Sequence, residues 1–541
     1  MTHAHVRVSN LCFAWPDGTP VFDHLAFTLG AGRTGLVAPN GAGKSTLLRL
    51  LAGELAPASG TIELSGTVGH LPQQLMLSGE LRVCEVLGVA KRLDALAAIA
   101  SGAVEPQLFD IVGDDWDLEE RTRTSLARLG LDHLSLDRRL HTLSGGETMA
   151  LALAAQQLRA PRILLLDEPS NHLDARARER LYQAIEAWDG CLIVASHDRE
   201  LLERMDRIAA LETSELSLYG GGFGFYDEAV RVEAEAAQRD VRQLRQAVKR
   251  EQRERQQARE RNERRTANAN RNAPDAGLAR IVAGNRKRAA QVSAARSDEI
   301  HADRMADAGE RLATARRSLR EEPDLSIELP ATQVPSTRLM FSGQGLQVMH
   351  DGRALFAGDG IDLHIRGPER IAIEGANGSG KTTLARLISG DLAPHAGRVR
   401  RSEGRVALLS QRLEALDAFD GAGTLSACFA ACTPQLGEVE RANLLARWLF
   451  RGAQMHLPIA ALSGGQRLRA SLACLLHASP APQLLVLDEP TNNLDLWASR
   501  ELERALRGYR GALVVISHDA AFLEALGLTR RLVLRDGVLV A

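Results

Sequence analysis

A glycine-rich run, Gly41-Ala42-Gly43-Lys44-Ser45-Thr46, recurs later in the chain as Gly378-Ser379-Gly380-Lys381-Thr382-Thr383. Each run follows an apolar segment and ends in a lysine and two hydroxyl residues. This pattern is typical of a phosphate-binding loop that opens a helix, where backbone amides hold phosphate oxygens and the lysine neutralises their charge. We therefore expect an α/β fold with two phosphate sites. The residues expected to contact nucleotide are Asn40, Gly41, Gly43, Lys44, Ser45 and Thr46 in the first copy, and Asn377, Gly378, Gly380, Lys381, Thr382 and Thr383 in the second.

Three further motifs follow each run in the same order, which indicates two copies of one domain. The first copy has about 19 extra residues after its glycine-rich run, and these predict a modest helical insertion around residues 91–116. The matched motifs are Leu143-Ser144-Gly145-Gly146-Glu147 with Leu462-Ser463-Gly464-Gly465-Gln466, Leu166-Asp167-Glu168-Pro169 with Leu487-Asp488-Glu489-Pro490, and Ser196-His197-Asp198 with Ser517-His518-Asp519.

Acidic residues end the two buried strands predicted at Ile163–Asp167 and Leu484–Asp488. A carboxylate at such a strand end can hold Mg²⁺ or its water, and the glutamate that follows can polarise the water that attacks a phosphate. A histidine after the next apolar strand would contact the γ-phosphate. The predicted metal ligands are Ser45, Asp167, Thr382 and Asp488, and the predicted catalytic residues are Glu168, Glu489, His197 and His518.

The first phosphate loop departs from the usual pattern at one position. It has Ala38 where the second loop has Gly375. We expect the methyl group to tighten the loop or to shift the β-phosphate slightly, without abolishing the site.

Composition limits the class of protein. The chain has 541 residues, enough for two or three domains, and its 45% apolar and 25% charged residues are typical of a globular protein. No apolar run approaches the roughly 18–20 residues of a membrane helix, and Met1–Asn10 has no hydrophobic signal region. We therefore expect a cytosolic protein without membrane insertion. The six cysteines lack the spacing of a metal site, so we expect them to pack as apolar residues.

A charged segment separates the two copies. From Asp227 to Glu322 the chain is rich in Arg, Ala, Gln and Glu, which favours two long helices with a break near Asn268–Gly277. Val241, Leu244 and Val248 form a short apolar stripe in the first helix, and Met305, Leu312 and Leu319 have heptad spacing in the second. The ends of these helices nearest the two copies can therefore pack against each other.

The same segment is strongly basic. Residues 239–296 include 17 basic and 6 acidic residues, although the whole chain has a net charge of −2. A basic hairpin on an acidic body suggests a polyanionic partner, and a solvated charged helix is the plain alternative. The segment from Asp227 to Met340 contains no Phe, Tyr or Trp. Arginine contacts to the phosphates of folded RNA therefore fit better than stacking on unpaired bases.

These motifs carry a family resemblance. The Leu-Ser-Gly-Gly-Glu/Gln motif between a phosphate loop and Leu-Asp-Glu-Pro resembles the ATP-binding cassette ATPases. Two cassettes joined by a charged helical linker, with Asp167–Asp174 and Asp488–Asp495 close to the family pattern, resemble the ABC-F translation factors over essentially the whole chain. The resemblance implies two P-loop cassettes that clamp head to tail around two ATP molecules with Mg²⁺. It also implies that the linker enters the ribosome toward tRNA and rRNA.

The resemblance assigns each ATP to both cassettes. A phosphate loop of one cassette would face the Ser-Gly-Gly motif of the other, and a glutamine would complete each metal site. Family members stack adenine on an aromatic residue before the phosphate loop, a role that Trp15 fits and His350 fits more weakly. The implied sites are Lys44, Ser45, Gln73, Asp167, Glu168 and His197 with Ser463, Gly464 and Gly465, and Lys381, Thr382, Gln411, Asp488, Glu489 and His518 with Ser144, Gly145 and Gly146.

We therefore expect a first cassette at residues 1–226, a charged helical linker at 227–334 and a second cassette at 335–541. The expected function is an ATPase that binds the ribosome in its ATP form and modulates translation, with antibiotic protection as one version. Two alternatives remain open: the motor of an exporter with a separate membrane subunit, and a DNA-repair ATPase. Co-purification with membranes would favour the first, and DNA-repair ATPases insert their coiled coil inside a cassette.

Overall fold

A computed structural model describes residues 5–73, 79–171, 173–272, 304–307, 310–312, 327, 329–350, 352–402, 404–409, 423–492 and 494–540. Within 258–272 it describes the helix but only some side chains. The chain divides into two compact units. One comprises Met1–Gly224 and Asp324–Ala541, and the other comprises Phe225–Pro323. The α/β class expected from the motifs is confirmed.

The first cassette is built on a six-stranded sheet in the order β5-β6-β7-β3-β8-β9. All neighbouring strands are parallel except β8 and β9. Every residue of β6 and β7 is buried, as expected for apolar runs in a parallel sheet covered on both faces. The strands are β3 (Gly32–Val37), β5 (Val68–Leu71), β6 (Ile163–Asp167), β7 (Cys191–Ala195), β8 (Arg207–Leu211) and β9 (Leu216–Gly220).

A three-stranded antiparallel sheet, in the order β2-β1-β4, completes the core of this cassette. Its alternating buried residues, such as Val6 and Val8, pack with the helix that follows the phosphate loop. The strands are β1 (Val6–Ala14), β2 (Pro20–Leu29) and β4 (Ser59–Leu64), and the helix is α1 (Lys44–Leu51).

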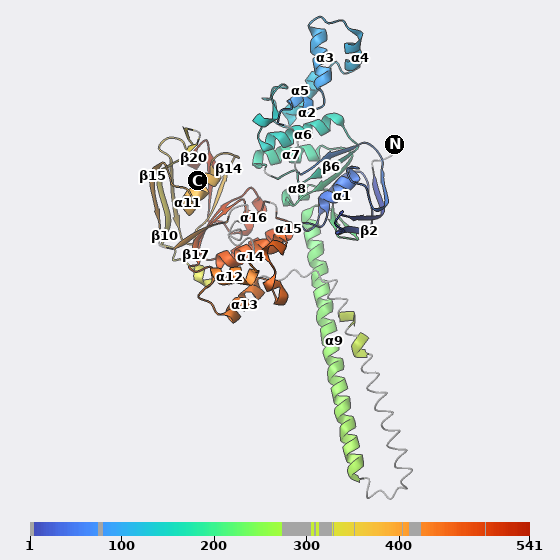
Figure 1. Ribbon diagram of the computed structural model, residues 1–541, viewed down its shortest axis with the longest axis vertical. Coiled ribbons are helices and arrows are strands. Elements are labelled where there is room, and N and C mark those ends of the chain that lie inside the picture. Colours follow the sequence, from blue (N-terminus) through green and yellow to red (C-terminus); the bar gives the residue numbers. More distant parts are fainter. Residues whose placement is uncertain are drawn as a thin grey trace. The chain divides into compact units, whose positions relative to one another are not determined.

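Helices form the rest of the first cassette. The insertion predicted around residues 91–116 is confirmed, because α3 and α4 occupy it and lie side by side (Figure 1). The remaining helices cover the sheet, and two of them begin directly after Ser144 and Asp198 of the repeated motifs. In chain order they are α2 (Val83–Val86), α3 (Ala90–Ala100), α4 (Pro106–Val112), α5 (Leu118–Arg128), the 3₁₀ turn η1 (Leu140–Thr142), α6 (Gly145–Arg159), α7 (Ala175–Glu186) and α8 (Arg199–Glu203).

The second cassette repeats this plan. Its six-stranded sheet has the order β16-β17-β18-β14-β19-β20, and its antiparallel sheet has the order β13-β10-β15. The strands are β10 (Leu339–Gln347), β11 (Met349–His350), β12 (Arg353–Ala354), β13 (Ile361–Arg366), β14 (Arg370–Gly375), β15 (Ala396–Arg401), β16 (Arg405–Leu409), β17 (Pro482–Asp488), β18 (Ala512–Ile516), β19 (Arg530–Arg535) and β20 (Val538–Val540).

The helices of the second cassette surround a core that includes Phe429, Trp448 and Phe450. Short 3₁₀ turns precede the cassette and its second motif. The elements are η3 (Pro330–Thr332), α11 (Lys381–Ser389), α12 (Leu425–Cys432), α13 (Glu438–Arg447), η5 (Gly452–His456), η6 (Ile459–Ala461), α14 (Gly464–Leu476), α15 (Leu496–Arg507) and α16 (Ala520–Ala525).

The linker begins with one long helix, α9 (Phe223–Asn272), of 50 residues (Figure 1). In the predicted apolar stripe of this helix, Val241 is buried and Leu244 and Val248 are half-buried. Residues 304–307 and 310–312 are helical. In the predicted break, residues 268–272 still belong to α9, whereas 273–277 lie outside the described residues, as does Leu319. Among the helices that the structure describes, none combines the length and the apolar character needed to cross a membrane.

Candidate nucleotide sites

The first phosphate loop lies at the carboxyl end of β3, where α/β proteins usually bind nucleotides. Gly43 caps α1 with a φ of +97°, and a Cβ atom there would come within 2.6 Å of a Val21 methyl group. Only glycine fits this position without strain. The Lys44 ammonium donates to the Ala38 carbonyl (3.0 Å) and lies 2.7 Å from His197 Nε2. Burial lowers the pKa of Lys44.

The difference between Ala38 and Gly375 has a local explanation. A Cβ atom on Gly375 would lie 2.4 Å from the Leu534 carbonyl oxygen, and the φ of Gly375 is +156°. Ala38 is absent from the described residues with positive φ, and its methyl group is buried in the core of the first cassette. The first loop therefore accommodates an alanine that the second loop could not.

Each predicted metal site contains a hydroxyl group bonded to a carboxylate. Ser45 hydrogen-bonds to Asp167, and Thr382 hydrogen-bonds to Asp488. Burial raises the pKa of both aspartates. In the described part of the chain, Oδ1 of each aspartate is buried without a hydrogen-bond partner. Oxygen ligands with an unused buried lone pair fit Mg²⁺, which prefers carboxylates and retains waters.

Glu168 and His197 face each other in the first site. His197 Nε2 lies 3.4 Å from Glu168 Oε1, and the His197 amide donates to Glu168 Oε2 (3.3 Å). Burial raises the pKa of Glu168 to about 8, with Lys44 opposing it. Burial, with Lys44 adding to it, lowers the pKa of His197 to about 3. The histidine is therefore neutral, and the glutamic acid can exchange a proton near neutral pH.

The second site repeats this arrangement. His518 Nε2 lies 3.4 Å from Glu489 Oε1, and the Lys381 ammonium donates to the carbonyls of Gly375 (2.7 Å) and Ala376 (2.9 Å). Burial raises the pKa of Glu489 to about 7. Burial, followed by Lys381 and Arg178, lowers the pKa of His518 to about 4.

Both glutamates have left-handed backbone conformations, with φ of +48° at Glu168 and +47° at Glu489. Their amides donate to the carbonyls of Ala195 (2.8 Å) and Ile516 (2.9 Å), at the ends of the neighbouring strands. Such a conformation is uncommon outside glycine and often marks a functional position. It turns the chain at the sheet edge and fixes each glutamate beside its histidine.

A cavity of about 570 Å³ surrounds the first phosphate loop. Trp15, Gln73 and the predicted loop residues line it, as do Asp167, Glu168 and His197. Residues of the second cassette also line it, and these are Thr491, Asn492, Leu494, Ser499 and Asp519. Among the described residues that line this cavity, Ser463, Gly464 and Gly465 do not occur. The contact between the first phosphate loop and that motif therefore stays a prediction.

The Ser-Gly-Gly motifs open helices, as their sequence predicts. Ser144 caps α6 and Ser463 caps α14, each paired with the residue three positions later in a capping box. The Ser463 amide donates to Gln466 Oε1 (2.9 Å), and the Ser144 amide donates to Glu147 Oε2 (2.8 Å). Both serines are exposed at their helix ends. The backbone amides of such ends are suited to bind an anion.

Two contacts between the cassettes involve Asp495 and Arg178, to which the sequence motifs assigned no individual role. The Asn40 amide donates to Asp495 Oδ2 (2.8 Å), and Arg178 donates to the His518 carbonyl (2.9 Å). Arg178 also opposes the raised pKa of Glu489. The sequence signal for Asp495 was its place at the end of the repeated segment 488–495, which begins with Asp-Glu-Pro. No such signal existed for Arg178, because the matching position in the second cassette is Ser499.

Two of the predicted site residues are not shown at a nucleotide site. Gln411 lies outside the described residues. His350 is exposed in the two-residue strand β11, where it pairs with Arg353 of β12. Its proposed contact with adenine stays a prediction.

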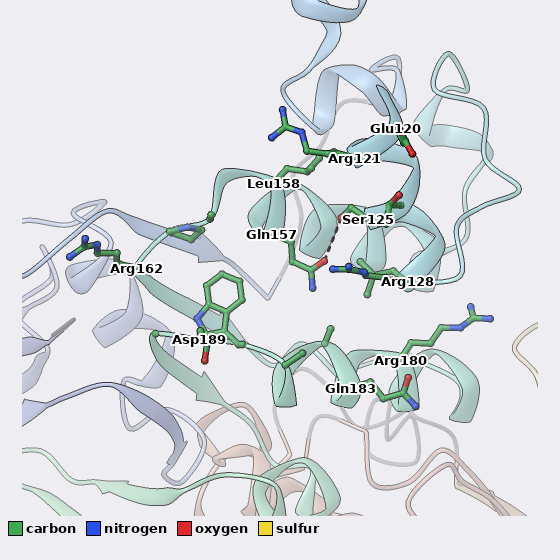
Figure 2. Close-up of a pocket in the computed structure, with 18 of the residues that line it drawn as sticks. Glu120, Arg121, Ser125, Arg128, Gln157, Leu158, Arg162, Arg180, Gln183 and Asp189 are labelled. Carbon is green, nitrogen blue, oxygen red and sulfur yellow. Dashed lines mark hydrogen bonds between the residues drawn. The ribbon is translucent and has the colours of Figure 1, made fainter. Parts of the chain in front are cut away.

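A larger cleft, of about 1330 Å³, lies elsewhere in the first cassette (Figure 2). Arg162 and Gly190, at the amino ends of β6 and β7, line it, so it lies at the opposite edge of the sheet from the phosphate loop. Ser125 donates to Gln157 within it (3.5 Å). None of the predicted site residues is among its described lining residues.

Comparisons with known proteins agree with this geometry. Residues 22–171 and 359–492 match the ABC transporter family. The chain is 33% identical to the tylosin resistance ATP-binding protein TlrC of Streptomyces fradiae over 96% of both chains. It is 31% identical to the probable ATP-binding protein YheS of Escherichia coli K12, over 93% of this chain and 75% of that one.

A solved structure supports the fold. The archaeal ribosome recycling factor aABCE1, in complex with the stalk protein aP1, has a TM-score of 0.54 and 18% identity, covering 98% of this chain and 89% of that one. The family match and the relatives show that the chain is an ATP-binding cassette protein of the ATPase type. It belongs to the ABC-F family of tandem ATP-binding cassette proteins.

Proposed function

We propose that this protein is a cytosolic ATPase that binds the ribosome in its ATP-bound form and leaves it after hydrolysis. The observation that carries this proposal is the basic helical segment between two cassettes, each of which places a predicted catalytic glutamate beside a histidine. The two parts have different roles, because the cassettes sense ATP and the linker contacts RNA.

The chemistry of each site follows from its own residues. Lys44 or Lys381 neutralises the phosphates, and the glutamate accepts a proton from the attacking water. A carboxyl group with a pKa near 7 or 8 is suited to take up and release a proton at cellular pH. Mg²⁺, held through the hydroxyl–aspartate pairs, would stabilise charge on the phosphate oxygens. The neutral histidine would orient the γ-phosphate.

Composite sites explain how two ATP molecules could couple the cassettes. Thr491, Asn492 and Leu494 of the second cassette already line the cavity around the first phosphate loop. In the ATP-bound form, the exposed helix ends at Ser144 and Ser463 would each bind the γ-phosphate of the opposite cassette. Hydrolysis would remove that phosphate and weaken the closure.

The linker is suited to RNA. Its described helix α9 is rich in arginine, and several of these side chains are exposed, including Arg253, Arg261 and Arg264. Guanidinium groups bind phosphate in a planar, two-pronged manner. The proposal therefore assigns tRNA and rRNA backbones as the linker's partners.

The relative TlrC is named for tylosin resistance. We extend the proposal to antibiotic protection of the ribosome, with tylosin as the compound to test first. A host that expresses the protein should then grow at higher tylosin concentrations than a host that expresses the hydrolysis-deficient form.

The main test uses the double variant Glu168→Gln, Glu489→Gln. We expect it to retain ATP while turnover falls about 10²–10⁴-fold, because the base that activates water is lost. The variant should sediment with ribosomes in ATP and should inhibit translation, whereas it should not sediment in ADP. Asp189→Asn, a change in the cleft of Figure 2, is the matched control and should behave as the natural protein. Unchanged steady-state ATPase would refute the glutamate assignment, and failure to sediment would refute ribosome binding.

A further inference from the structure

The hairpin of β1 and β2 contains a bulge opposite a cysteine. Leu11 pairs with Leu25 and Phe13 pairs with Phe22, so two residues of β2 face the single residue Cys12. One of these two, His24, has a φ of +52°. A bulge redirects the side chains at the point where it interrupts the ladder. Here it brings Asp23 and His24 to the same place as the thiol.

Three potential metal ligands meet at this bulge. A ligand atom of Cys12, one of Asp23 and one of His24 all lie within 4.8 Å of one another. His24 Nε2 is 3.8 Å from Asp23 Oδ1, and the His24 amide donates to Cys12 Sγ (3.3 Å). The Asp23 and His24 side chains are 71% and 72% exposed, so they can rotate without breaking core packing. An ion can reach them from solvent.

We propose that Cys12, Asp23 and His24 bind a divalent transition-metal ion of the zinc class. A thiolate, an imidazole and a carboxylate form the donor set that Zn²⁺ and Co²⁺ use, whereas Mg²⁺ and Ca²⁺ prefer oxygen ligands alone. At zinc bond lengths, ligand atoms in a tetrahedral site lie roughly 3.5 Å apart, so small side-chain rotations would close this group. A water completes the fourth position. The site is separate from the Mg²⁺ sites proposed for the nucleotides, and it does not depend on ribosome binding.

The second cassette has a different side chain at the position that corresponds to Cys12, where the two strands of the hairpin meet. Leu346 matches Leu11 in the repeat, so Gln347 stands where the first cassette has Cys12. The Gln347 amide donates to the Phe356 carbonyl (2.7 Å) and accepts from the Phe356 amide (3.0 Å). The Gln347 side chain therefore joins the two segments of the hairpin through two hydrogen bonds. In the first cassette, the Cys12 thiol accepts from the His24 amide (3.3 Å) and donates to the Asn10 carbonyl (3.9 Å), and no side-chain amide joins the strands there in the described residues. A metal would join the strands instead.

The position of the site gives the metal a structural consequence. Val21 and Phe22, which directly precede the bulge, pack within 3 Å of the Cβ position of Gly43 in the phosphate loop. Trp15 lies beyond β1 in the same hairpin and lines the cavity around that loop. A metal that joins the two strands would fix this wall of the first nucleotide site.

The test is a titration of the full-length, reduced, nucleotide-free protein with Co²⁺. We expect saturable one-to-one binding with a thiolate-to-cobalt charge-transfer band, and Zn²⁺ should displace the cobalt. The band should disappear in Cys12→Ser. In His24→Asn, which retains a residue that tolerates the left-handed backbone, affinity should fall by more than the roughly 10–100-fold that loss of an outer-shell partner costs. Millimolar Mg²⁺ or Ca²⁺ should not compete.

The matched control is His364→Asn, on β13, which is the strand of the second cassette that corresponds to β2. It should bind Co²⁺ as the natural protein does. A charge-transfer band that survives in Cys12→Ser would place the thiolate elsewhere and overturn the proposal. So would the absence of saturable binding, or equal loss of affinity in the control. Circular dichroism checks that each variant retains its secondary structure.

Discussion

His477 lies in an aromatic environment at the end of α14. Its ring centroid is 6.1 Å from that of Phe429 and 6.2 Å from that of Trp448, both in edge-on geometry. Burial lowers the pKa of His477 to about 4, and the charge of Arg447 adds to this effect. Within the described chain, its Nε2 atom is buried without a hydrogen-bond partner. A proton on this ring would therefore be poorly accommodated in the folded protein.

The pH dependence of stability follows from that shift. In the unfolded chain His477 binds a proton at its ordinary pKa of about 6.5, whereas in the folded protein it does so only near pH 4. The contribution of the neutral His477 to the free energy of unfolding is therefore complete above pH 6.5 and is lost as the pH falls toward 4. Between pH 7.5 and pH 5 we expect a loss of about 2 kcal/mol from this residue. His477→Gln should reduce the difference between the calorimetric unfolding temperatures at these two pH values. The exposed His364→Gln is the control, and an equal reduction there would contradict the assignment.

Arg178 is the residue that most clearly distinguishes the two nucleotide sites. It donates to the His518 carbonyl, and the corresponding Ser499 cannot supply a charge to the first site. In a Glu168→Gln background, where only the second site should hydrolyse ATP, Arg178→Gln should reduce single-turnover hydrolysis roughly tenfold through loss of a charge-assisted contact. Arg176→Gln, two positions earlier in α7 and exposed, should have little effect. Equal rates in both variants would show that Arg178 has no role in the second site.

At the scale of elements, the sequence predicts what depends on local pattern. Buried strands ending at Asp167 and Asp488 and capped helices beginning after Ser144 and Ser463 follow from apolar runs and capping residues, and the structure has them. The left-handed turns at the glutamates could not be predicted, because they arise from hydrogen bonds to a neighbouring strand that is distant in sequence.

The bulge opposite Cys12 shows the same limit. Cysteine spacing along the chain indicated apolar packing, and Cys12 lies 11 and 12 positions before Asp23 and His24. Strand pairing brings these residues together, and a register irregularity turns their side chains to one place. Spacing along the sequence alone cannot reveal a site made by strand pairing.

The linker is the element whose chemistry can be tested apart from the cassettes. Replacing Arg264, Arg265, Arg271, Arg286, Lys287 and Arg288 with Gln should weaken ribosome binding and flatten its salt dependence. Each lost phosphate contact removes released counterions and lowers the log–log slope by somewhat under one. The phosphate loops are untouched, so basal ATPase should change little. Sedimentation at several salt concentrations measures the slope, and an unaltered slope would favour a solvated spacer over an RNA probe.

At the scale of the whole molecule, duplication produced two sites that are similar but not equal. The Lys44 ammonium contacts His197, whereas Lys381 contacts two carbonyls of its own loop. The two sites share a raised glutamate pKa, which burial brings to about 8 for Glu168 and to about 7 for Glu489. The different contacts of the two lysines predict that the two sites hydrolyse ATP at different rates, although both contain the predicted catalytic glutamate and histidine.

The proposed composite arrangement of the ATP sites leads to a prediction that requires the full chain. In a Glu489→Gln background, only the site that contains Lys44 should hydrolyse ATP, and Ser463→Arg should reduce that rate roughly 100-fold, because a helix end that binds the γ-phosphate in the transition state is blocked. Ser144→Arg is the matched control. Both serines are exposed helix caps with a capping box, so each change costs a similar cap energy of about 1 kcal/mol.

Ser144→Arg blocks the other site, whose hydrolysis the background has already removed, so its effect on the measured rate should be much smaller. Single-turnover hydrolysis measures both variants under the same conditions. Separately expressed cassettes provide the second measurement, since in the proposed arrangement neither would contain a complete site. If they hydrolyse ATP as fast as the full chain, with no gain on mixing, each cassette is sufficient alone. The coupling between residues 44 and 463, which are distant in the sequence, would then have no physical basis.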